Sequence, residues 1–214
     1  MPRMFCAALS TAMLASLAGA VPVAQETPRT PAEIAASSEQ PSTAAYRYRT
    51  AIAGLLLLKP GMVVAELGPG SGYVARAMAS QVLPGGRVIV AALDRPMAAY
   101  IADKAKAEAV QNLSAIVVQP DGRGLEPASL DAVAIVNAFG GFAQKGDVLA
   151  SVAAALKPGG ALLIVDLPAE EVGPKVVGID ADEVIKLAAA AGLEREAEST
   201  VVPGQYAIRF RKPA

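Results

Sequence analysis

The sequence contains no histidine and no tryptophan, and its single cysteine is at position 6. Without histidine, the chain lacks the usual general base near neutral pH and the commonest metal ligand. One cysteine cannot form an internal disulfide, and Cys6 lies in a stretch that we expect to be removed. Disulfides, cysteine nucleophiles and Cys/His metal sites are therefore excluded for the mature chain, for which we predict no metal.

Charged and aromatic residues are also scarce, at 18% and 4% of the chain, and the net charge is −1. The lack of a basic excess argues against a nucleic-acid partner, because binding to the phosphate backbone depends on clustered positive charge. Hydrophobic residues are plentiful at 53%, which excludes a disordered chain as a whole. A length of 214 residues is enough for one medium domain with a substantial core.

Residues 1–20 have the pattern of a signal peptide. Arg3 gives a positive start, and the apolar run from Met4 to Leu17 is too short to span a bilayer comfortably. Ala18-Gly19-Ala20 then fits the small-x-small cleavage pattern. A buried N-terminal helix is the less favoured alternative, because the run leads into a proline-rich tail. We expect an exported, periplasmic product that begins at Val21 and is not inserted in a membrane.

Residues 21–43 are rich in proline, serine, threonine, alanine and glutamine, which predicts a flexible leader. From residue 44 to 214 a single domain is expected, in which apolar strands alternate with helices. The strands are uniformly apolar, which is typical of a parallel sheet covered on both faces. Strands are predicted at 62–67, 87–93, 115–118, 131–136 and 161–165, and helices at 44–59, 73–82, 96–110 and 148–156.

The C-terminal part predicts one more helix and two closing strands. Asp180-Ala-Asp-Glu183 is an analogue of a capping box, with Ile179 and Val184 placed for a hydrophobic staple, and the helix would end at Gly192. The strands are expected at 195–200 and 206–211, around Pro203-Gly204.

A glycine-rich loop follows the first predicted strand, which ends in Glu66. Gly68, Gly70 and Gly72 allow a sharp turn and a close approach of a ligand to the backbone. The spacing is G-x-G-x-G, without the extra residue of dinucleotide-binding loops and without the lysine of a P-loop. A carboxylate at position 66 would repel phosphates but suits a cationic ligand such as a sulfonium amino acid. The loop therefore predicts a nucleoside site, with a purely structural turn as the alternative.

Three motifs, taken in order, resemble those of the class I S-adenosylmethionine-dependent methyltransferases. Val64-Ala-Glu-Leu-Gly-Pro-Gly-Ser-Gly-Tyr73 is similar to their first motif, and Pro84-Gly-Gly-Arg-Val-Ile89 to the entry of their second strand. Leu156-Lys-Pro-Gly-Gly160, before a strand ending in Asp166, is similar to the entry of their fifth strand. Gln205-Tyr206 resembles a subgroup with bacterial signal peptides.

The resemblance covers most of the chain after about residue 44. It implies an α/β, Rossmann-like methyltransferase fold with a mostly parallel seven-stranded sheet and helices on both faces. It also implies S-adenosylmethionine as cofactor and a role in binding it for Glu66, Gly68, Gly70, Gly72, Tyr73, Asp94, Asp121 and Asn137.

Individual roles are implied in the same way. Glu66 and the three glycines would hold the methionine part and the ribose, Asp121 would face the adenine amino group, and Asn137 would lie near the reacting methyl. Two alternatives stay open, since Asp121-Gly122 can be a plain turn and Asn137 can be a capping residue.

Two departures from the family pattern bear on the site. The family usually has an acidic residue at the end of the second strand, where this chain has Ala92 and Leu93. The nearest acid is Asp94, which we expect in the following loop, turned inward to the ribose. The related subgroup often has histidines after the fourth strand, and none is present here, so no catalytic base is assigned.

We therefore expect a methyltransferase that acts on a small molecule. The second hypothesis is an exported binding protein on a degenerate methyltransferase scaffold, because S-adenosylmethionine is made in the cytoplasm. A dehydrogenase is disfavoured by the glycine spacing. An enzyme that methylates nucleic-acid amino groups is disfavoured by the charge and by the missing prolines in Asn137-Ala-Phe-Gly140.

Overall fold

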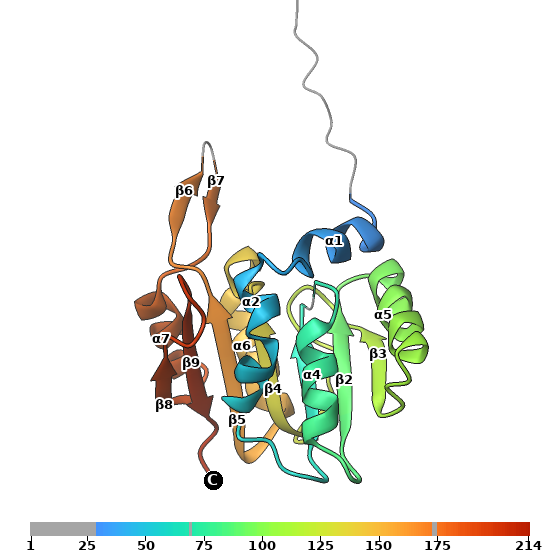
Figure 1. The fold of residues 1–214 in the computed structure, drawn as a ribbon. Helices are drawn as coiled ribbons and strands as arrows, with labels where there is room; N and C mark the ends of the chain where they lie inside the picture. Colours follow the sequence, from blue (N-terminus) through green and yellow to red (C-terminus); the bar gives the residue numbers. More distant parts are fainter. Residues whose placement is uncertain (1–28, 69, 173–174) are drawn as a thin grey trace, which may run out of the picture.

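A computed structural model of the protein describes residues 29–68, 70–172 and 175–214 (Figure 1). The predicted signal peptide and the first part of the predicted leader lie outside these residues. Within the described ranges, no helix combines the length and the apolar character needed to cross a membrane.

A seven-stranded sheet forms the centre of the domain, in the order β3-β2-β1-β4-β5-β9-β8. The first five strands of the chain pair in parallel, and β9 pairs antiparallel with both β5 and β8. This topology confirms the predicted mostly parallel, Rossmann-like sheet. The strands are β1 (Val63–Leu67), β2 (Arg87–Ala92), β3 (Leu113–Val117), β4 (Leu130–Val136), β5 (Leu156–Asp166), β8 (Glu194–Ser199) and β9 (Tyr206–Arg211).

Helices cover both faces of this sheet, as predicted. Side chains alternate along each strand, so Val64 belongs to the core on one face and Ala65 to the core on the other. The first core is completed by α2 (Ala44–Arg47), α3 (Arg49–Gly54), α4 (Tyr73–Gln81) and α5 (Arg95–Ala107). The second is completed by α6 (Lys145–Ala155) and α7 (Ala181–Ala190).

Part of the predicted flexible leader is helical, so that prediction was wrong for the described residues 31–38. Helix α1 (Pro31–Ser38) begins with a complete capping box, in which Thr30 Oγ1 accepts from the N–H of Glu33 and the Glu33 carboxylate accepts from the N–H of Thr30 at 2.8 Å. Proline at the first helical position also favours this start. Composition suggested a linker, but the local capping chemistry determines the structure.

Three other predictions need correction. The single helix expected over 44–59 is divided at Tyr48 into α2 and α3, and it ends at Gly54. Asp180 is the N-cap residue of α7, but its side chain makes no capping bond and its Oδ1 instead accepts from the N–H of Ala169 at 3.2 Å. The fifth strand begins at Leu156, where pairing with Leu130 precedes a register shift, rather than at residue 161.

A two-stranded hairpin that the sequence did not predict follows β5. Strands β6 (Glu170–Val172) and β7 (Lys175–Val177) pair antiparallel and stand above the end of the sheet (Figure 1). In the same view, α1 also lies above the ends of the parallel strands, to the right of the hairpin. The two additions therefore flank the edge at which the parallel strands end.

Candidate functional site

The carboxyl ends of β1, β2, β3 and β4 share one edge of the sheet, because these strands run parallel. Ligands of open α/β sheets bind at this edge, outside the strand ends. The residues predicted to bind the cofactor lie at the ends of these strands or in the loops that follow them, except Tyr73, which is the first residue of α4. The edge is therefore the candidate site.

Two of the three glycines in the first loop are required by the fold. Gly68 has a φ of +66° and Gly72 a φ of +73°, values that favour glycine. A side chain on Gly68 would begin 3.1 Å from the ring of Phe142, and one on Gly72 would begin 3.2 Å from Ile101. Both positions thus turn the backbone and allow close packing of the loop.

Gly70 is different, because its backbone is outside the left-handed region and the fold leaves space beside it. A side chain there would begin 3.9 Å from Ser38 Oγ and 4.0 Å from Ile34 Cγ2, which are ordinary contact distances. The fold does not require glycine at this position. A ligand that approaches the backbone closely would require it.

Glu66 lies at the end of β1 and is only 2% exposed. Its Oε2 accepts a hydrogen bond of 2.7 Å from the backbone N–H of Ala75, in the first turn of α4. Burial raises the pKa of Glu66 to about 7, against the lowering effects of the Ala75 bond and the charge of Arg76. Its charge can therefore respond, near neutral pH, to a cation placed beside the loop.

Tyr73, the first residue of α4, is buried rather than open to a ligand. Its ring meets that of Tyr46 edge-on, with 5.7 Å between centroids. Burial and the nearby carboxylates of Glu66 and Glu39 raise the pKa of its hydroxyl above the usual range. Its observed role is to join α4 to α2.

Asp94 lies two residues beyond β2, in the loop, as predicted. It is the N-cap of α5, and its Oδ1 accepts from the N–H of Met97 at 2.7 Å. A carboxylate has a second oxygen that can accept another bond, so the capping role leaves a ribose contact possible. Ala92, at the usual place of the family's acid, is buried.

Asp121 lies in a turn after β3. Its Oδ1 accepts from the N–H of Arg123 at 3.1 Å, and its Oδ2 accepts from Arg123 Nε at 2.6 Å. The backbone bond from Arg123, together with the guanidinium, lowers the pKa of Asp121. Both oxygens are engaged within the turn, which favours the turn interpretation over contact with adenine.

Asn137 is exposed at the end of β4 and has a φ of +51°. Its N–H donates to the carbonyl of Val165 at 2.8 Å, which holds this conformation in place. Asparagine tolerates left-handed backbone better than most residues, and such strain clusters at functional sites. No side-chain capping bond is made to the short 3₁₀ helix Phe139–Gly141 that follows, so the capping alternative is not observed.

Asp166, at the end of β5, is a residue of the site that the sequence reasoning did not assign. It is 3% exposed and accepts from the N–H groups of Gly140 at 2.9 Å and Leu167 at 2.8 Å. Burial raises its pKa, which these bonds partly oppose. Asp166 holds the loop that begins at Asn137 in place. The signal available in the sequence was an acidic residue at the end of an apolar strand.

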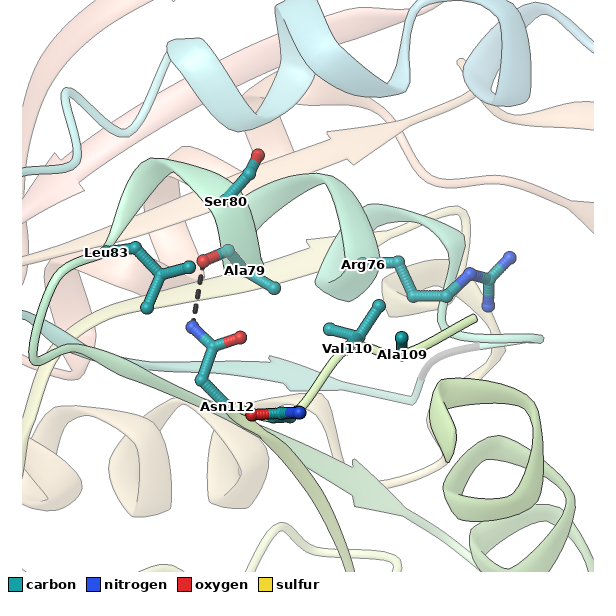
Figure 2. A pocket seen from close by; sticks show the side chains of 8 residues that line it. Arg76, Ala79, Ser80, Leu83, Ala109, Val110 and Asn112 are labelled. Carbon is teal, nitrogen blue, oxygen red and sulfur yellow. Dashed lines mark hydrogen bonds between the residues drawn. The ribbon is translucent and has the colours of Figure 1, made fainter. Parts of the chain in front are cut away.

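A cavity of about 310 Å³ elsewhere on the molecule does not belong to this site (Figure 2). It lies between α4 and the segment that leads from α5 to β3, and residues of 76–83 and 109–112 line it. Asn112, which lines it, donates 2.8 Å and 3.2 Å bonds to the carbonyls of Ala79 and Gly86. The guanidinium of Arg76 points away from Asn112 in Figure 2. The cavity is therefore lined by groups that serve the fold.

The described part of the chain contains no group of three or more histidine, cysteine, aspartate or glutamate side chains placed to hold a metal ion.

Comparison with known proteins gives the class of this fold. Residues 64–160 match a protein-family model described as a methyltransferase domain. An S-adenosylmethionine-dependent methyltransferase from Aquifex aeolicus is 19% identical, with a TM-score of 0.74 over 86% of this chain and 100% of its own. A methyltransferase from Haloferax volcanii, in complex with the activator Trm112, is 19% identical, with a TM-score of 0.70 over 88% of this chain and 100% of the matched chain. A phosphoethanolamine N-methyltransferase from Haemonchus contortus with bound S-adenosylhomocysteine is 17% identical, with a TM-score of 0.66 over 79% of this chain and 53% of the matched chain.

The chain thus has the class I methyltransferase fold, which confirms the fold predicted from the sequence. The domain match and these neighbours support the predicted methyltransferase activity and the predicted S-adenosylmethionine cofactor. A search of functionally curated proteins finds no match.

Proposed function

We propose that the protein transfers a methyl group from S-adenosylmethionine to a small molecule. The observation that carries this proposal is that Gly70, at a position where the fold does not require glycine, follows the buried carboxylate of Glu66 at the end of β1. A carboxylate beside a glycine turn suits a nucleoside with a cationic tail better than one with phosphates.

The residues present fit this cofactor. A side chain at Gly70 would fill the space beside the loop, although the fold itself does not need that space. Glu66 has its pKa raised to about 7 by burial, and a neighbouring ammonium or sulfonium would favour its ionised form. The N–H groups at the start of α4 lie next to the loop and suit a carboxylate.

S-adenosylmethionine supplies a methyl group that its sulfonium already activates. The protein therefore has mainly to align the acceptor and exclude water, and a strong base is not always required. Asn137 is held in position by its bond to Val165 and, through the following loop, by Asp166. This rigid support lets the Asn137 amide orient an acceptor at the strand edge.

The acceptor is expected to have an apolar part. Several exposed apolar side chains lie along this edge, where Leu93 follows β2, Leu167 follows β5, and Val172 and Val177 belong to the hairpin. Each is at least 40% exposed, and exposed apolar residues that gather in one region mark binding surfaces. No large positive patch is implied by the net charge of −1, which agrees with a small molecule rather than a nucleic acid.

Calorimetric titration of the domain with S-adenosylmethionine and S-adenosylhomocysteine tests the cofactor assignment. Binding of both ligands with a single site is expected. Incubation with labelled S-adenosylmethionine and a panel of small apolar amines, phenols and thiols then tests transfer. The absence of binding of either ligand to the folded protein would overturn the proposal.

A second candidate is a binding protein on a degenerate methyltransferase scaffold. Asp94 caps α5, Asp121 is engaged by Arg123, and Ala92 stands in place of the usual ribose acid. A similar fold occurs in a protein with another activity, because the [4+2]-cyclase SpnF is similar to this chain with a TM-score of 0.67 at 16% identity. Weak or absent S-adenosylhomocysteine binding, with tight binding of an apolar ligand, would favour this candidate.

We also propose that the protein is exported to the periplasm. The proposal is supported by the charge and apolar pattern of residues 1–20 and by the Ala18-Gly19-Ala20 cleavage site. Mass spectrometry of the protein from its native host should find Val21 at the N-terminus. A cytoplasmic product that retains Met4 would be inconsistent with it.

A further inference from the structure

Helix α1 lies directly over the glycine loop. Ile34 and Ser38 are the nearest atoms to the position where a side chain on Gly70 would begin, at 4.0 Å and 3.9 Å. Ser38 Oγ also reaches Ser71 Oγ at 3.5 Å. The helix crosses the ends of the central strands and contacts α5 (Figure 1). Its lower surface thus covers the part of the loop that the cofactor is expected to approach.

A charge cluster fastens the end of α1 to the body of the domain. Glu39, which follows the helix, pairs through one oxygen with Arg76 of α4 at 2.8 Å and through the other with Lys104 of α5 at 2.6 Å. The three side chains are 14%, 10% and 22% exposed, so solvent screens them only in part. Burial alone would raise the pKa of Glu39, but hydrogen bonds with Lys104, Ser71 and Arg76 outweigh it and hold that pKa below its usual range.

Arg76 connects this cluster to the loop itself. Its Nη1 donates to the carbonyl of Ser71 at 2.8 Å, between Gly70 and Gly72. Its Nε pairs with Glu108 at 2.9 Å. One guanidinium therefore joins the glycine loop, the end of α1 and the end of α5. A change at Glu39 can therefore reach the loop through Arg76 as well as through Ser71.

We propose that residues 29–43 are part of the cofactor site, with Ile34 and Ser38 as its cover and Glu39 as the positioning residue that latches the cover closed. The proposal rests on the proposed binding of S-adenosylmethionine. The cover must move away for the cofactor to enter beside Gly70, and it then closes over the bound molecule. Residues 21–43, expected from composition to be only a leader, would include a functional element.

Two features of the structure allow this latch to open. A polar hollow of about 290 Å³, lined by Glu39, Tyr46, Arg49 and Arg76 among others, lies beside the ion pair of Glu39 and Arg76. Helix α1 is short, with eight residues, and Ala35 is its one buried residue. A short helix with little buried apolar surface can separate from the domain without unfolding the core.

The test compares Glu39→Gln with the matched control Glu108→Gln. Both remove a carboxylate partner of Arg76, but only Glu39 belongs to the segment that covers the loop. Surface plasmon resonance with S-adenosylhomocysteine gives the association and dissociation rate constants. We expect both rates to rise about tenfold or more in Glu39→Gln, as for the loss of a charge-assisted bond. Glu108→Gln should keep the rates of the wild type.

Amide hydrogen exchange provides a second readout that needs no ligand. Exchange of residues 31–38 should be faster in Glu39→Gln than in Glu108→Gln. If Glu39→Gln does not fold, Lys104→Met removes the other ion pair of the latch and is expected to act in the same direction. Unchanged rates and unchanged exchange in a variant that folds would overturn the latch. Failure of the wild type to bind S-adenosylhomocysteine would instead overturn the proposed function, and the two failures are thereby distinguished.

Discussion

Glu66 and Ala75 are joined by a 2.7 Å hydrogen bond in which a buried carboxylate accepts the N–H of the third residue of α4. The bond ties the end of β1 to the helix that follows the glycine loop, across the turn at Gly68 and Gly72. It satisfies a helix N–H that has no partner within the helix. The same carboxylate has its pKa raised to about 7 by burial, so the loop is held by a group that titrates near neutral pH.

Replacing Glu66 with glutamine should make stability less dependent on pH. The pKa of Glu66 is near 4.5 in the unfolded chain and about 7 in the folded protein. The stability that its protonated form contributes is therefore complete below about pH 4.5 and is lost as the pH rises to about 7, by on the order of 3 kcal/mol. Glu66→Gln keeps an oxygen for Ala75 and has no such loss. Urea denaturation followed by circular dichroism between pH 4.5 and 8 measures this, with Glu170→Gln on the exposed hairpin as control. Parallel stability curves for Glu66→Gln and the wild type would contradict the burial argument.

Gly70→Val should abolish binding of S-adenosylmethionine while the domain remains folded. The space at Gly70 accepts a first side-chain carbon at ordinary contact distance, but the branched methyls of valine would occupy the region between the loop and α1. Gly146→Val, at a position in α6 with open surroundings, is the matched control. Calorimetric titration compares the two, with thermal unfolding as the check on folding. Unchanged affinity in folded Gly70→Val would show that the ligand binds elsewhere.

The fold could be predicted from the sequence because its signals are local and repeated. Apolar strands such as Val63–Leu67, which Gly68 follows, alternate with helices and thereby indicate both the strand positions and the parallel arrangement. The element boundaries were less accurate where a tertiary bond decides them, as at Asp180, whose carboxylate is bound by Ala169. Helix α1 was missed because a proline- and serine-rich composition concealed the capping box of Thr30 and Glu33.

The candidate site was predictable in part. The glycine loop is contiguous in sequence, so its role follows from spacing, whereas backbone conformation and packing in the structure distinguish Gly70 from Gly68 and Gly72. Asp166 and Glu39 could not be assigned roles in this way. Their partners Gly140 and Arg76 are 26 and 37 residues away, and no sequence pattern relates them.

Two substitutions separate the helix-capping role of Asp94 from its proposed role in binding the ribose. Asp94→Ala removes the cap of α5 and should cost about 1 kcal/mol of stability. Asp94→Ser retains a capping oxygen and should cost little. If the second carboxylate oxygen also binds the ribose, both variants should bind S-adenosylhomocysteine about tenfold to a hundredfold more weakly. Calorimetric titration and urea denaturation together provide the comparison. Wild-type affinity in Asp94→Ser would limit the residue to its capping role.

Asn137 allows backbone strain and side-chain function to be separated. At a φ of +51°, Asn137→Ala places an alanine where left-handed backbone costs about 1 kcal/mol or more, and Asn137→Gly removes that cost. The free energy of unfolding should therefore fall in the alanine variant and stay equal or rise slightly in the glycine variant. Both lose the amide, so both should show the same fall in kcat/KM for methyl transfer if the amide orients the acceptor. Equal activity losses with opposite changes in stability would assign the function to the side chain. If Asn137→Gly retained full activity and Asn137→Ala did not, the backbone conformation would be the feature that matters, because only the alanine variant would disturb the bond to Val165 that holds the strand end.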